Sequence, residues 1–377
     1  MRACAVLLLL AAAAAVAAAA KPSAKLSLPG SKSPIVFALI GGGLEQLKVA
    51  ELMNMACAKR GCQFVVNTGE NVYNARDMHA LRGLPWINSL GNHDVLGLKG
   101  GVDEQIAYQQ KNKNWILPGR WFNTDVSGAS TSIRFHVAHT SCWVKKYRVP
   151  GNDYYNNELT YCSSNSSVAK QLSFLEFSMN SSSADWNIVI AHHPAVSTAG
   201  PSYFDPSQKP DTGADGWGPF ADLVAKYKPE AYFNGHDHAM SFQYAPEPVT
   251  TGDTTLATGF PNTGFHTSGA GSWPQASAAA DGGFGLNPPY SFTKYSNVDW
   301  LKGLARSGFA IVTVDKKEMV IDYYSVDNGL TVPFRVTTKK GQPPIWQFSP
   351  EGLRLTKLPN TIQMNQDGEY VQFRRKI

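Results

Sequence analysis

Ala231-Tyr232-Phe233-Asn234-Gly235-His236-Asp237-His238 is the stretch that decides the fold. A short apolar strand stops at a glycine, and side chains that bind metals or transfer protons follow at once. The same arrangement occurs three more times, in Gly69-Glu70-Asn71-Val72-Tyr73, Gly91-Asn92-His93-Asp94 and Ala191-His192-His193-Pro194. Open α/β sheets bind their ligands at the carboxyl ends of strands. We therefore expect the four motifs to converge at strand ends.

The segments around these motifs predict an α/β fold. Apolar runs indicate strands, and apolar residues at helical spacing lie between several of them. Strands are expected at 35–40, 64–66, 86–90, 188–191 and 231–233, helices around 44–55, 168–179 and 220–227, and a hairpin at 309–314 and 319–324. Alternating strands and helices followed by a strand-rich end favour a sandwich of mixed sheets with helices outside.

The domain organisation expected from the sequence is one large domain at residues 34–330. The stretch 250–289 is rich in Gly, Ser, Ala and Pro, and it indicates long loops carried by the scaffold. Residues 331–377 contain few periodic segments, so we expect a C-terminal extension there. No internal repeat is found in the sequence.

The first twenty residues are typical of a signal peptide, with one Arg, an apolar stretch and small residues before Lys21. A membrane anchor is the alternative, because residues 3–20 are uncharged and just long enough to cross a bilayer. Their alanine-rich second half is weakly hydrophobic, which favours cleavage. We expect a secreted or vacuolar/lysosomal protein with no membrane segment after cleavage. Asn-Xaa-Ser motifs at Asn165 and Asn180 are then potential glycosylation sites.

Beyond residue 20 the chain has four cysteines, an even number that suits an oxidising compartment. Of three possible connectivities, the local pairs Cys57–Cys62 and Cys142–Cys162 are the simplest. The net charge of +5 is modest for 377 residues, and the Lys and Arg residues are scattered. Nucleic-acid binding is therefore not indicated.

Five of the nine histidines lie in three of the strand-end motifs. Imidazole together with carboxylate, amide and phenolate oxygens suits Zn, Fe or Mn. A single histidine in a protein is at least as often a hydrogen-bonded structural residue as a metal ligand. Three coordinated motifs favour a metal centre.

The four motifs stand in the order of the metallophosphoesterase motifs, and the tyrosine resembles that of the purple, tartrate-resistant acid phosphatases. The resemblance covers residues 35–330 and also includes Leu84-Pro85-Trp86, Ser268-Gly269-Ala270-Gly271-Ser272 and Gly308-Phe309-Ala310. It implies a four-layer α/β/β/α sandwich of two mixed sheets flanked by helices. It also implies hydrolysis of phosphate monoesters at a dinuclear centre of Fe(III) with Fe, Zn or Mn.

The resemblance further implies a role for each motif residue. Tyr73 and His238 correspond to ligands of the ferric first metal, and Asn92, His192 and His236 to ligands of the second. Glu70 stands where the family has a bridging aspartate. His93 corresponds to the group that contacts the substrate or leaving group, and Asp94 would orient His93. Asp237 is a further carboxylate that could orient its neighbours.

Several positions depart from the family pattern. Gly42 stands where the first motif has a metal-binding aspartate, and no nearby carboxylate replaces it except Glu45. Glu70 is one methylene longer than aspartate. The spacings of 28 positions from Gly42 to Glu70 and 22 from Glu70 to Asn92 are short. Pro201 replaces a histidine, for which His193, His139 or His266 are possible substitutes. We expect weakened occupancy of the first metal.

Three interpretations follow. The first is an acid phosphatase-like phosphoric monoester hydrolase, acting on phosphate monoesters and impaired to some degree by Gly42. The second is a catalytically inactive relative that serves as a secreted binding or structural glycoprotein. The third is a sequence that lacks coding segments of an active protein. A phosphodiesterase of the same superfamily is the alternative enzyme, disfavoured by Tyr73 and the Ser-Gly-Ala-Gly-Ser stretch.

Overall fold

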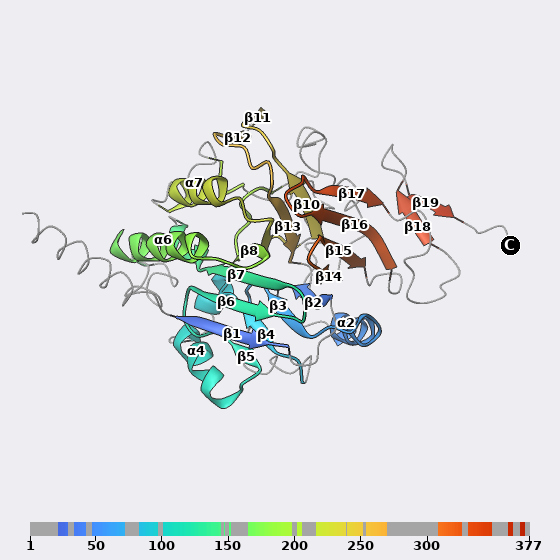
Figure 1. Cartoon of the computed structure of the whole chain (residues 1–377), viewed down its shortest axis with the longest axis horizontal. Coiled ribbons are helices and arrows are strands. Elements are labelled where there is room, and N and C mark those ends of the chain that lie inside the picture. The colour runs from blue at the N-terminus through green and yellow to red at the C-terminus, as the bar shows by residue number, and fades with distance from the viewer. Residues whose placement is uncertain are drawn as a thin grey trace, which may run out of the picture.

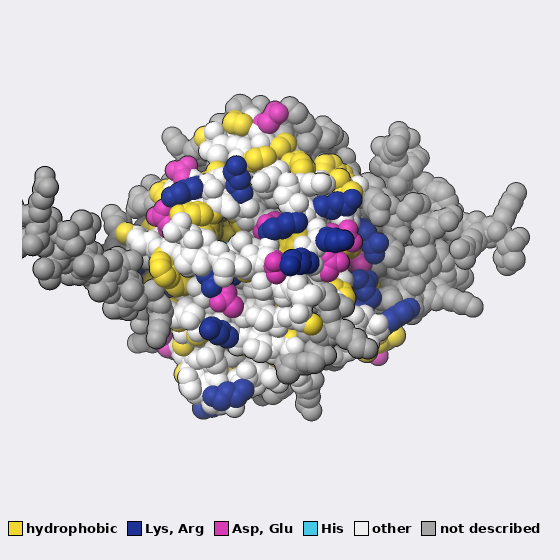
Figure 2. Space-filling model, in the orientation of Figure 1, with side chains coloured by type: hydrophobic (Ala, Val, Ile, Leu, Met, Phe, Trp, Pro, Cys, Tyr) yellow, Lys and Arg dark blue, Asp and Glu magenta, His cyan; other side chains and the backbone are white. Residues whose placement is uncertain are grey.

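The protein was analysed as a computed structural model, shown in Figure 1. The residues described are 22–28, 34–42, 47–71, 83–96, 101–144, 147, 151, 165–197, 202–205, 216–238, 240–251, 254–269, 308–325, 331–348, 361–364 and 370–373. Within this part of the chain no helix is long and apolar enough to cross a bilayer. On the face shown in Figure 2, Lys and Arg side chains are interspersed with acidic ones.

The first sheet has seven strands in the order β1-β6-β7-β8-β9-β13-β10. Its strands are β1 (Ser23–Ser27), β6 (Phe122–Ser127), β7 (Ser132–Ala138), β8 (Trp186–Ala191), β9 (Ala231–Asn234), β10 (Met240–Tyr244) and β13 (Gly264–Ser268). Strands β7, β8, β9 and β13 run parallel, whereas β10 pairs with β13 antiparallel. The carboxyl ends of β8 and β9 therefore lie next to each other.

The second sheet has eight strands in the order β17-β16-β15-β14-β2-β3-β4-β5. Its strands are β2 (Ile35–Ile40), β3 (Phe64–Asn67), β4 (Trp86–Asn88), β5 (Trp115–Ile116), β14 (Gly308–Val314), β15 (Glu318–Ser325), β16 (Thr331–Lys339) and β17 (Ile345–Phe348). Strands β2 to β5 are parallel and the others antiparallel. Two small two-stranded sheets pair β11 (Val249–Thr251) with β12 (Thr254–Leu256) and β18 (Thr361–Met364) with β19 (Tyr370–Phe373).

The two large sheets pack face to face over a shared apolar core. Phe37 of β2 stacks on Phe64 of β3 at 4.8 Å between ring centroids, and it meets Phe135 of the other sheet edge-on at 5.6 Å. Such aromatic pairs add about 0.5–1.5 kcal/mol beyond their buried area. Strand β2 is buried at every position, which explains its continuous apolar sequence.

Helices flank the two large sheets. They are α2 (Leu47–Arg60), α3 (Asn92–Leu96), α4 (Gly101–Lys111), α6 (Asn165–Asn180), α7 (Trp217–Tyr227) and the 3₁₀ helix η1 (Thr140–Trp143). Helices α6 and α7 pack on the seven-stranded sheet and α2 on the eight-stranded sheet, each over its own apolar cluster. Figure 1 shows them on opposite sides. The chain thus has the predicted four-layer α/β/β/α architecture.

Two expectations about the later part of the chain differ from the structure. The stretch 250–289 was expected to form loops, but its residues 264–268 form β13, which lies between β9 and β10. The extension was expected to begin at residue 331, but β16 and β17 continue the eight-stranded sheet through β15. Because Val336 and Thr338 are buried on that sheet, residues 331–348 are continuous with it.

Of the cysteine pairs, Cys57–Cys62 is confirmed, with 4.8 Å between the Cα atoms. It closes the end of α2. Cys142 is also disulfide-bonded, and Cys162 lies outside the described residues. Residues 1–20, the predicted signal peptide, lie outside them too.

Candidate metal centre

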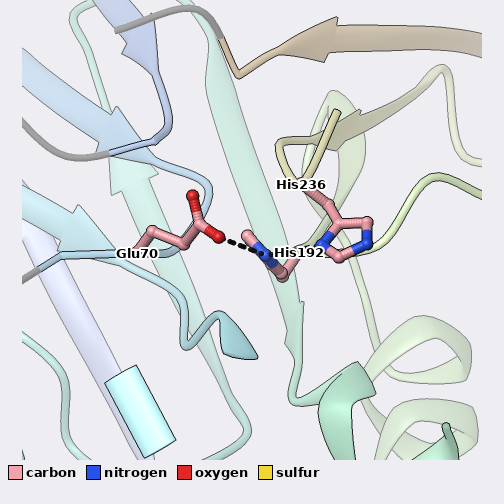
Figure 3. Close-up of side chains that lie close together, drawn as sticks. All are labelled: Glu70, His192 and His236. Atoms are coloured by element: carbon pink, nitrogen blue, oxygen red, sulfur yellow. Dashed lines mark hydrogen bonds and ion pairs between the residues drawn. The ribbon is translucent and has the colours of Figure 1, made fainter. Parts of the chain in front are cut away.

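The strand-end motifs meet where the carboxyl ends of the two sheets face each other. Glu70 follows β3, and Asn92 begins α3 just after β4, both from the eight-stranded sheet. His192 and His236 follow β8 and β9 of the seven-stranded sheet. The motifs therefore converge as predicted, and each sheet supplies two of the four side chains. Figure 3 shows Glu70 directed toward His192, with His236 beyond it.

The backbone at this junction is held in unusual conformations. Glu70 and His236 have left-handed φ angles of 61° and 66°, which cost about 1–2 kcal/mol for residues with a side chain. A Cβ at Gly69 (φ 105°) would lie only 2.6 Å from His192 Nδ1. Glycine is required there because the two sheets approach closely. Left-handed residues of this kind are concentrated at functional sites.

His192 is oriented by the backbone. Its ring is fully buried, and Nδ1 lies 2.9 Å from the carbonyl oxygen of Thr68. A carbonyl oxygen only accepts, so Nδ1 carries a hydrogen, and the neutral ring would present the Nε2 lone pair to a metal. That nitrogen faces Asn92 Oδ1 at 2.8 Å and His236 Nδ1 at 3.3 Å. Metal-binding histidines usually have their second nitrogen held in this way.

Asn92 completes a compact group of donors with the two histidines. Its Oδ1 lies 3.0 Å from His236 Nδ1 as well as 2.8 Å from His192 Nε2. Ligand atoms of Glu70, His192 and His236 all lie within 4.8 Å of one another. Metal–ligand bonds of about 2.0–2.2 Å place two ligands of one ion within about 4.4 Å. One transition-metal ion therefore fits among these side chains with small adjustments.

Glu70 is a buried carboxylate surrounded by imidazoles. Oε1 lies 3.5 Å from His192 Nε2, and Oε2 lies 3.2 Å from His238 Nε2. Burial raises its pKa, but hydrogen bonds and charge interactions with these two histidines outweigh burial and hold the pKa well below its usual range. The carboxylate is therefore ionised at neutral pH.

His93 borders the group on its more open side. Its side chain is 40% exposed, and Nε2 lies 3.7 Å from Glu70 Oε1. Burial lowers its pKa, partly offset by the charge of Glu70. This position suits contact with a substrate, and its predicted role stays a prediction.

Asp94 anchors the backbone of the site. Its fully buried carboxylate accepts hydrogen bonds from the N–H groups of Gly91, Glu70 and Asn71 at 2.7, 2.8 and 2.8 Å. Burial raises its pKa to about 6, although the hydrogen bonds lower it. Asp94 thus fixes the left-handed turn that carries Glu70. Its expected role in orienting His93 stays a prediction.

Gln105 of α4 is a residue that sequence reasoning missed. Its Nε2 donates to Asp94 Oδ1 at 3.1 Å, and its Oε1 accepts from Asn71 Nδ2 at 3.0 Å. Asn71 Nδ2 also donates to the carbonyl oxygen of Ser89 at 2.7 Å. All four residues are buried. A polar residue in a helix without a motif gives no sequence signal, so only the fold reveals this network.

Gly42, which stands where the family has a metal-binding aspartate, has no room for a side chain. Gly42 has φ 78°, and a Cβ built on it would lie 2.4 Å from the carbonyl oxygen of Gly269. A side chain at this position therefore requires backbone movement as well as a strained φ. Tyr73, Glu45 and Pro201 lie outside the described residues.

The histidines considered as substitutes for the one lost at Pro201 have different surroundings. His193 Nδ1 lies 2.8 Å from Thr140 Oγ1, and its ring lies 4.4 Å from that of His236. His266 belongs to β13 and lies 2.8 Å from the Tyr323 hydroxyl in the core. Burial lowers the pKa of both His139 and His266 to about 3, so these two rings are neutral.

Asp237 lies on the buried side of the β9 motif. It accepts a short hydrogen bond from the Ser197 hydroxyl. Burial raises its pKa to about 6, against the effect of that hydrogen bond. The serine thereby couples the β8 loop to the β9 loop. The expected orienting role of Asp237 stays a prediction.

Comparison with known proteins identifies the class. The Calcineurin-like phosphoesterase family matches residues 47–240, just over half of the chain. The chain therefore belongs to this family.

The named relatives are acid phosphatases. The chain is 26% identical over 243 residues to purple acid phosphatase 7 of Arabidopsis thaliana, covering 58% of this chain and 68% of that protein. It is 24% identical over 332 residues to tartrate-resistant acid phosphatase type 5 of Homo sapiens, covering 78% and 88%. The resemblance stated from the motifs is thus confirmed.

Solved structures share the fold. GAP50, the anchor in the inner membrane complex of Plasmodium, has a TM-score of 0.54 at 17% identity, covering 83% of this chain and 90% of that one. Purple acid phosphatase PPD1 from yellow lupin has a TM-score of 0.52 at 15% identity, covering 83% and 55%. At these identities the likeness concerns the fold alone.

Proposed function

We propose that this protein is a metal-dependent phosphoric monoester hydrolase whose best-formed metal position comprises Asn92, His192, His236 and Glu70. The observation that carries the proposal is the convergence of His192 Nε2, His236 Nδ1 and Asn92 Oδ1 within 3.3 Å of one another. The Thr68 carbonyl fixes the tautomer of His192 that a metal requires. The similarity to acid phosphatases supports phosphate monoesters as substrates.

Each residue of the site has a separate role in the proposed hydrolysis. A bound cation supplies Lewis-acid stabilisation of the negative charge on the phosphoryl oxygens. Glu70 contributes a carboxylate that neighbouring imidazoles keep ionised. His93 stands on the open side, 3.7 Å from Glu70, where its Nε2 can hold a proton for the departing alkoxide. Such proton transfer contributes about 10²–10⁴-fold in rate. Asp94 and Gln105 keep the Glu70 turn in place.

The finer parts of the proposal concern cofactor and location. We propose a dinuclear centre, with Fe(III) joined by Fe, Zn or Mn, in which Tyr73 and His238 belong to the first position. A signal peptide at residues 1–20, removed by cleavage, would direct the protein to the secretory pathway, as a secreted or vacuolar/lysosomal glycoprotein. The disulfide between Cys57 and Cys62 supports an oxidising compartment.

A second candidate function is a catalytically inactive binding protein. The closed position at Gly42 favours it, because the backbone of Gly269 occupies the space of the missing ligand. The chain also shares its fold with a protein described as an anchor in a membrane complex. In this reading the metal position stabilises the fold, and phosphate esters are bound without turnover.

One experiment separates these candidates. The chain from Lys21 onward is expressed, its metal content is measured by mass spectrometry, and hydrolysis of an aryl phosphate is assayed. Asn92→Ala is compared with Asn114→Ala, an exposed residue of the same type. We expect Asn92→Ala to lose metal affinity by about tenfold or more, with activity falling alongside. The control variant is expected to behave as the unmodified protein.

The outcomes are distinct. Bound metal with turnover in the unmodified protein and the control supports the hydrolase. Bound metal without turnover supports the binding protein. Absence of bound metal from the unmodified protein after reconstitution contradicts both candidates.

A further inference from the structure

The two departures from the family pattern, Gly42 and Glu70, meet in space. They follow β2 and β3, neighbouring parallel strands, and Gly42 N–H donates to the Gly69 carbonyl oxygen at 3.2 Å. A Cβ built at Gly42 would lie 3.7 Å from Glu70 Oε2. The glutamate carboxylate therefore reaches toward the space into which a side chain at position 42 would project.

The two oxygens of Glu70 face different halves of the site. Oε1 lies 3.5 Å from His192 Nε2, which belongs to the group with Asn92 and His236. Oε2 lies 3.2 Å from Nε2 of His238. One carboxylate thus spans two sets of nitrogen donors, with a separate oxygen for each.

Side-chain length sets this reach because the backbone is fixed. The N–H of Glu70 is held by Asp94 at 2.8 Å, and its φ of 61° directs the side chain into the site. Aspartate would shorten the side chain by one carbon–carbon bond of about 1.5 Å. Since Asp94 does not let the turn move, an aspartate carboxylate would withdraw from one of the two histidines.

We propose that Glu70 compensates for Gly42, by giving one oxygen to each of two metal cations. Oε1 serves the ion held by Asn92, His192 and His236, and Oε2 serves an ion held with His238. The extra methylene brings a carboxylate oxygen to within 3.7 Å of the Cβ position at residue 42, beside the space that the Gly269 carbonyl closes. This inference rests on the proposed metal site and deepens it.

The test is a Co²⁺ titration followed by visible absorption and by mass spectrometry of bound metal. The unmodified protein is expected to bind two equivalents. Glu70→Asp is expected to keep the equivalent on the His192 side and to weaken the other by about tenfold or more. Glu176→Asp, the same change at an exposed residue of α6, is the matched control and is expected to bind as the unmodified protein does.

Because Glu70 is buried, Glu70→Asp can impair folding, so a second variant is tested as well. His238→Gln removes a second side-chain donor of the same ion, so it is expected to weaken the same equivalent and to change the same absorption band. Thermal melting with and without Co²⁺ reports folding for each variant. Metal-induced stabilisation should be reduced in both variants and not in the control.

Two results would overturn the inference. One is a Glu70→Asp protein that keeps both equivalents with affinities within about twofold of the unmodified protein. The other is an unmodified protein that binds a single equivalent. If that single-equivalent protein hydrolyses an aryl phosphate, the proposed function stands while the compensation by Glu70 fails. If instead the unmodified protein binds two equivalents, Glu70→Asp weakens one of them and no hydrolysis is detected, the compensation by Glu70 stands while the proposed hydrolase activity fails.

Discussion

Restoring the family aspartate by Gly42→Asp is expected to destabilise this protein and not to restore a metal ligand. The sequence alone suggests that the substitution would repair the site. The structure indicates otherwise, because Gly42 has φ 78° and its Cβ would meet the Gly269 carbonyl oxygen at 2.4 Å. Glu70 Oε2 also lies 3.7 Å from that Cβ, so a second carboxylate would be placed against an existing one.

The size of the effect follows from two contributions. A left-handed φ costs a residue with a side chain about 1–2 kcal/mol. Forcing atoms into occupied space adds about 1–3 kcal/mol. Gly61 offers a control for the first contribution, since it has φ 73° and no atom within 4 Å of its Cβ position. Gly61→Asp should therefore cost only the backbone strain.

The assay is thermal and urea unfolding of Gly42→Asp, Gly61→Asp and the unmodified protein, each with and without added Zn²⁺. We expect Gly42→Asp to lose about 1–3 kcal/mol more than Gly61→Asp, which is roughly 1–4 °C in Tm for a chain of 377 residues. Added metal should not recover the difference. Equal stability of the two variants, or a Gly42→Asp protein that gains a metal equivalent, would refute the reasoning.

Three further predictions concern the support of the site and the stability of the fold. Gln105→Leu removes the bonds to Asp94 and Asn71, so unfolding free energy should fall by about 1–3 kcal/mol and Zn²⁺ affinity by about tenfold; an unchanged titration would contradict its positioning role. Burial lowers the pKa of His136 from 6.5 to about 4, so the stability it contributes as a neutral ring is present above pH 6.5 and is lost as the pH falls toward 4. The loss is about 1.4 kcal/mol at about pH 5.5, and His136→Gln should show a smaller acid-induced drop in urea midpoint than the unmodified protein. Cys57→Ser opens a disulfide between residues five positions apart, which should cost about 2 kcal/mol. The variant keeps the disulfide of Cys142, so reductant should lower the stability of both proteins, and the unmodified protein should lose about 2 kcal/mol more than the variant.

Several of the strands that the sequence revealed are buried on both faces. Residues 35–40 and 231–234 are buried throughout, so their apolar runs were visible without a partner. Strands β6 and β7 were not predicted, because buried polar residues such as Asn123, Thr124 and His136 interrupt their apolar pattern. His136 is buried because Ser178 and Asn187 bond its ring, and these partners are far away in the sequence.

The later strands were obscured for a similar reason. In β13, His266 and Thr267 are fully buried, and the surrounding Gly, Ser and Pro residues made this segment resemble a loop. In β16, Pro333 and the run of threonines concealed a strand that pairs along its length with β15. These segments form strands because they pair with neighbouring strands, and their local sequence pattern does not reveal that pairing.

The candidate site could be predicted where a site residue comes shortly after a strand in the sequence. Glu70, Asn92, His192 and His236 each follow a strand directly, so strand order was enough to bring them together. Gln105 was missed because it lies in a helix without a motif. Sequence also revealed the loss of a side chain at position 42, but not that Gly269, more than 200 residues later, fills the space.

Anomalous diffraction from crystals loaded with Zn²⁺ tests the central claim most directly. The claim is that Asn92, His192, His236 and Glu70 form a metal position. It predicts an anomalous peak about 2.0–2.2 Å from His192 Nε2, His236 Nδ1 and Asn92 Oδ1, with Glu70 Oε1 alongside. Peaks elsewhere, with none among these four side chains at saturating Zn²⁺, would contradict it.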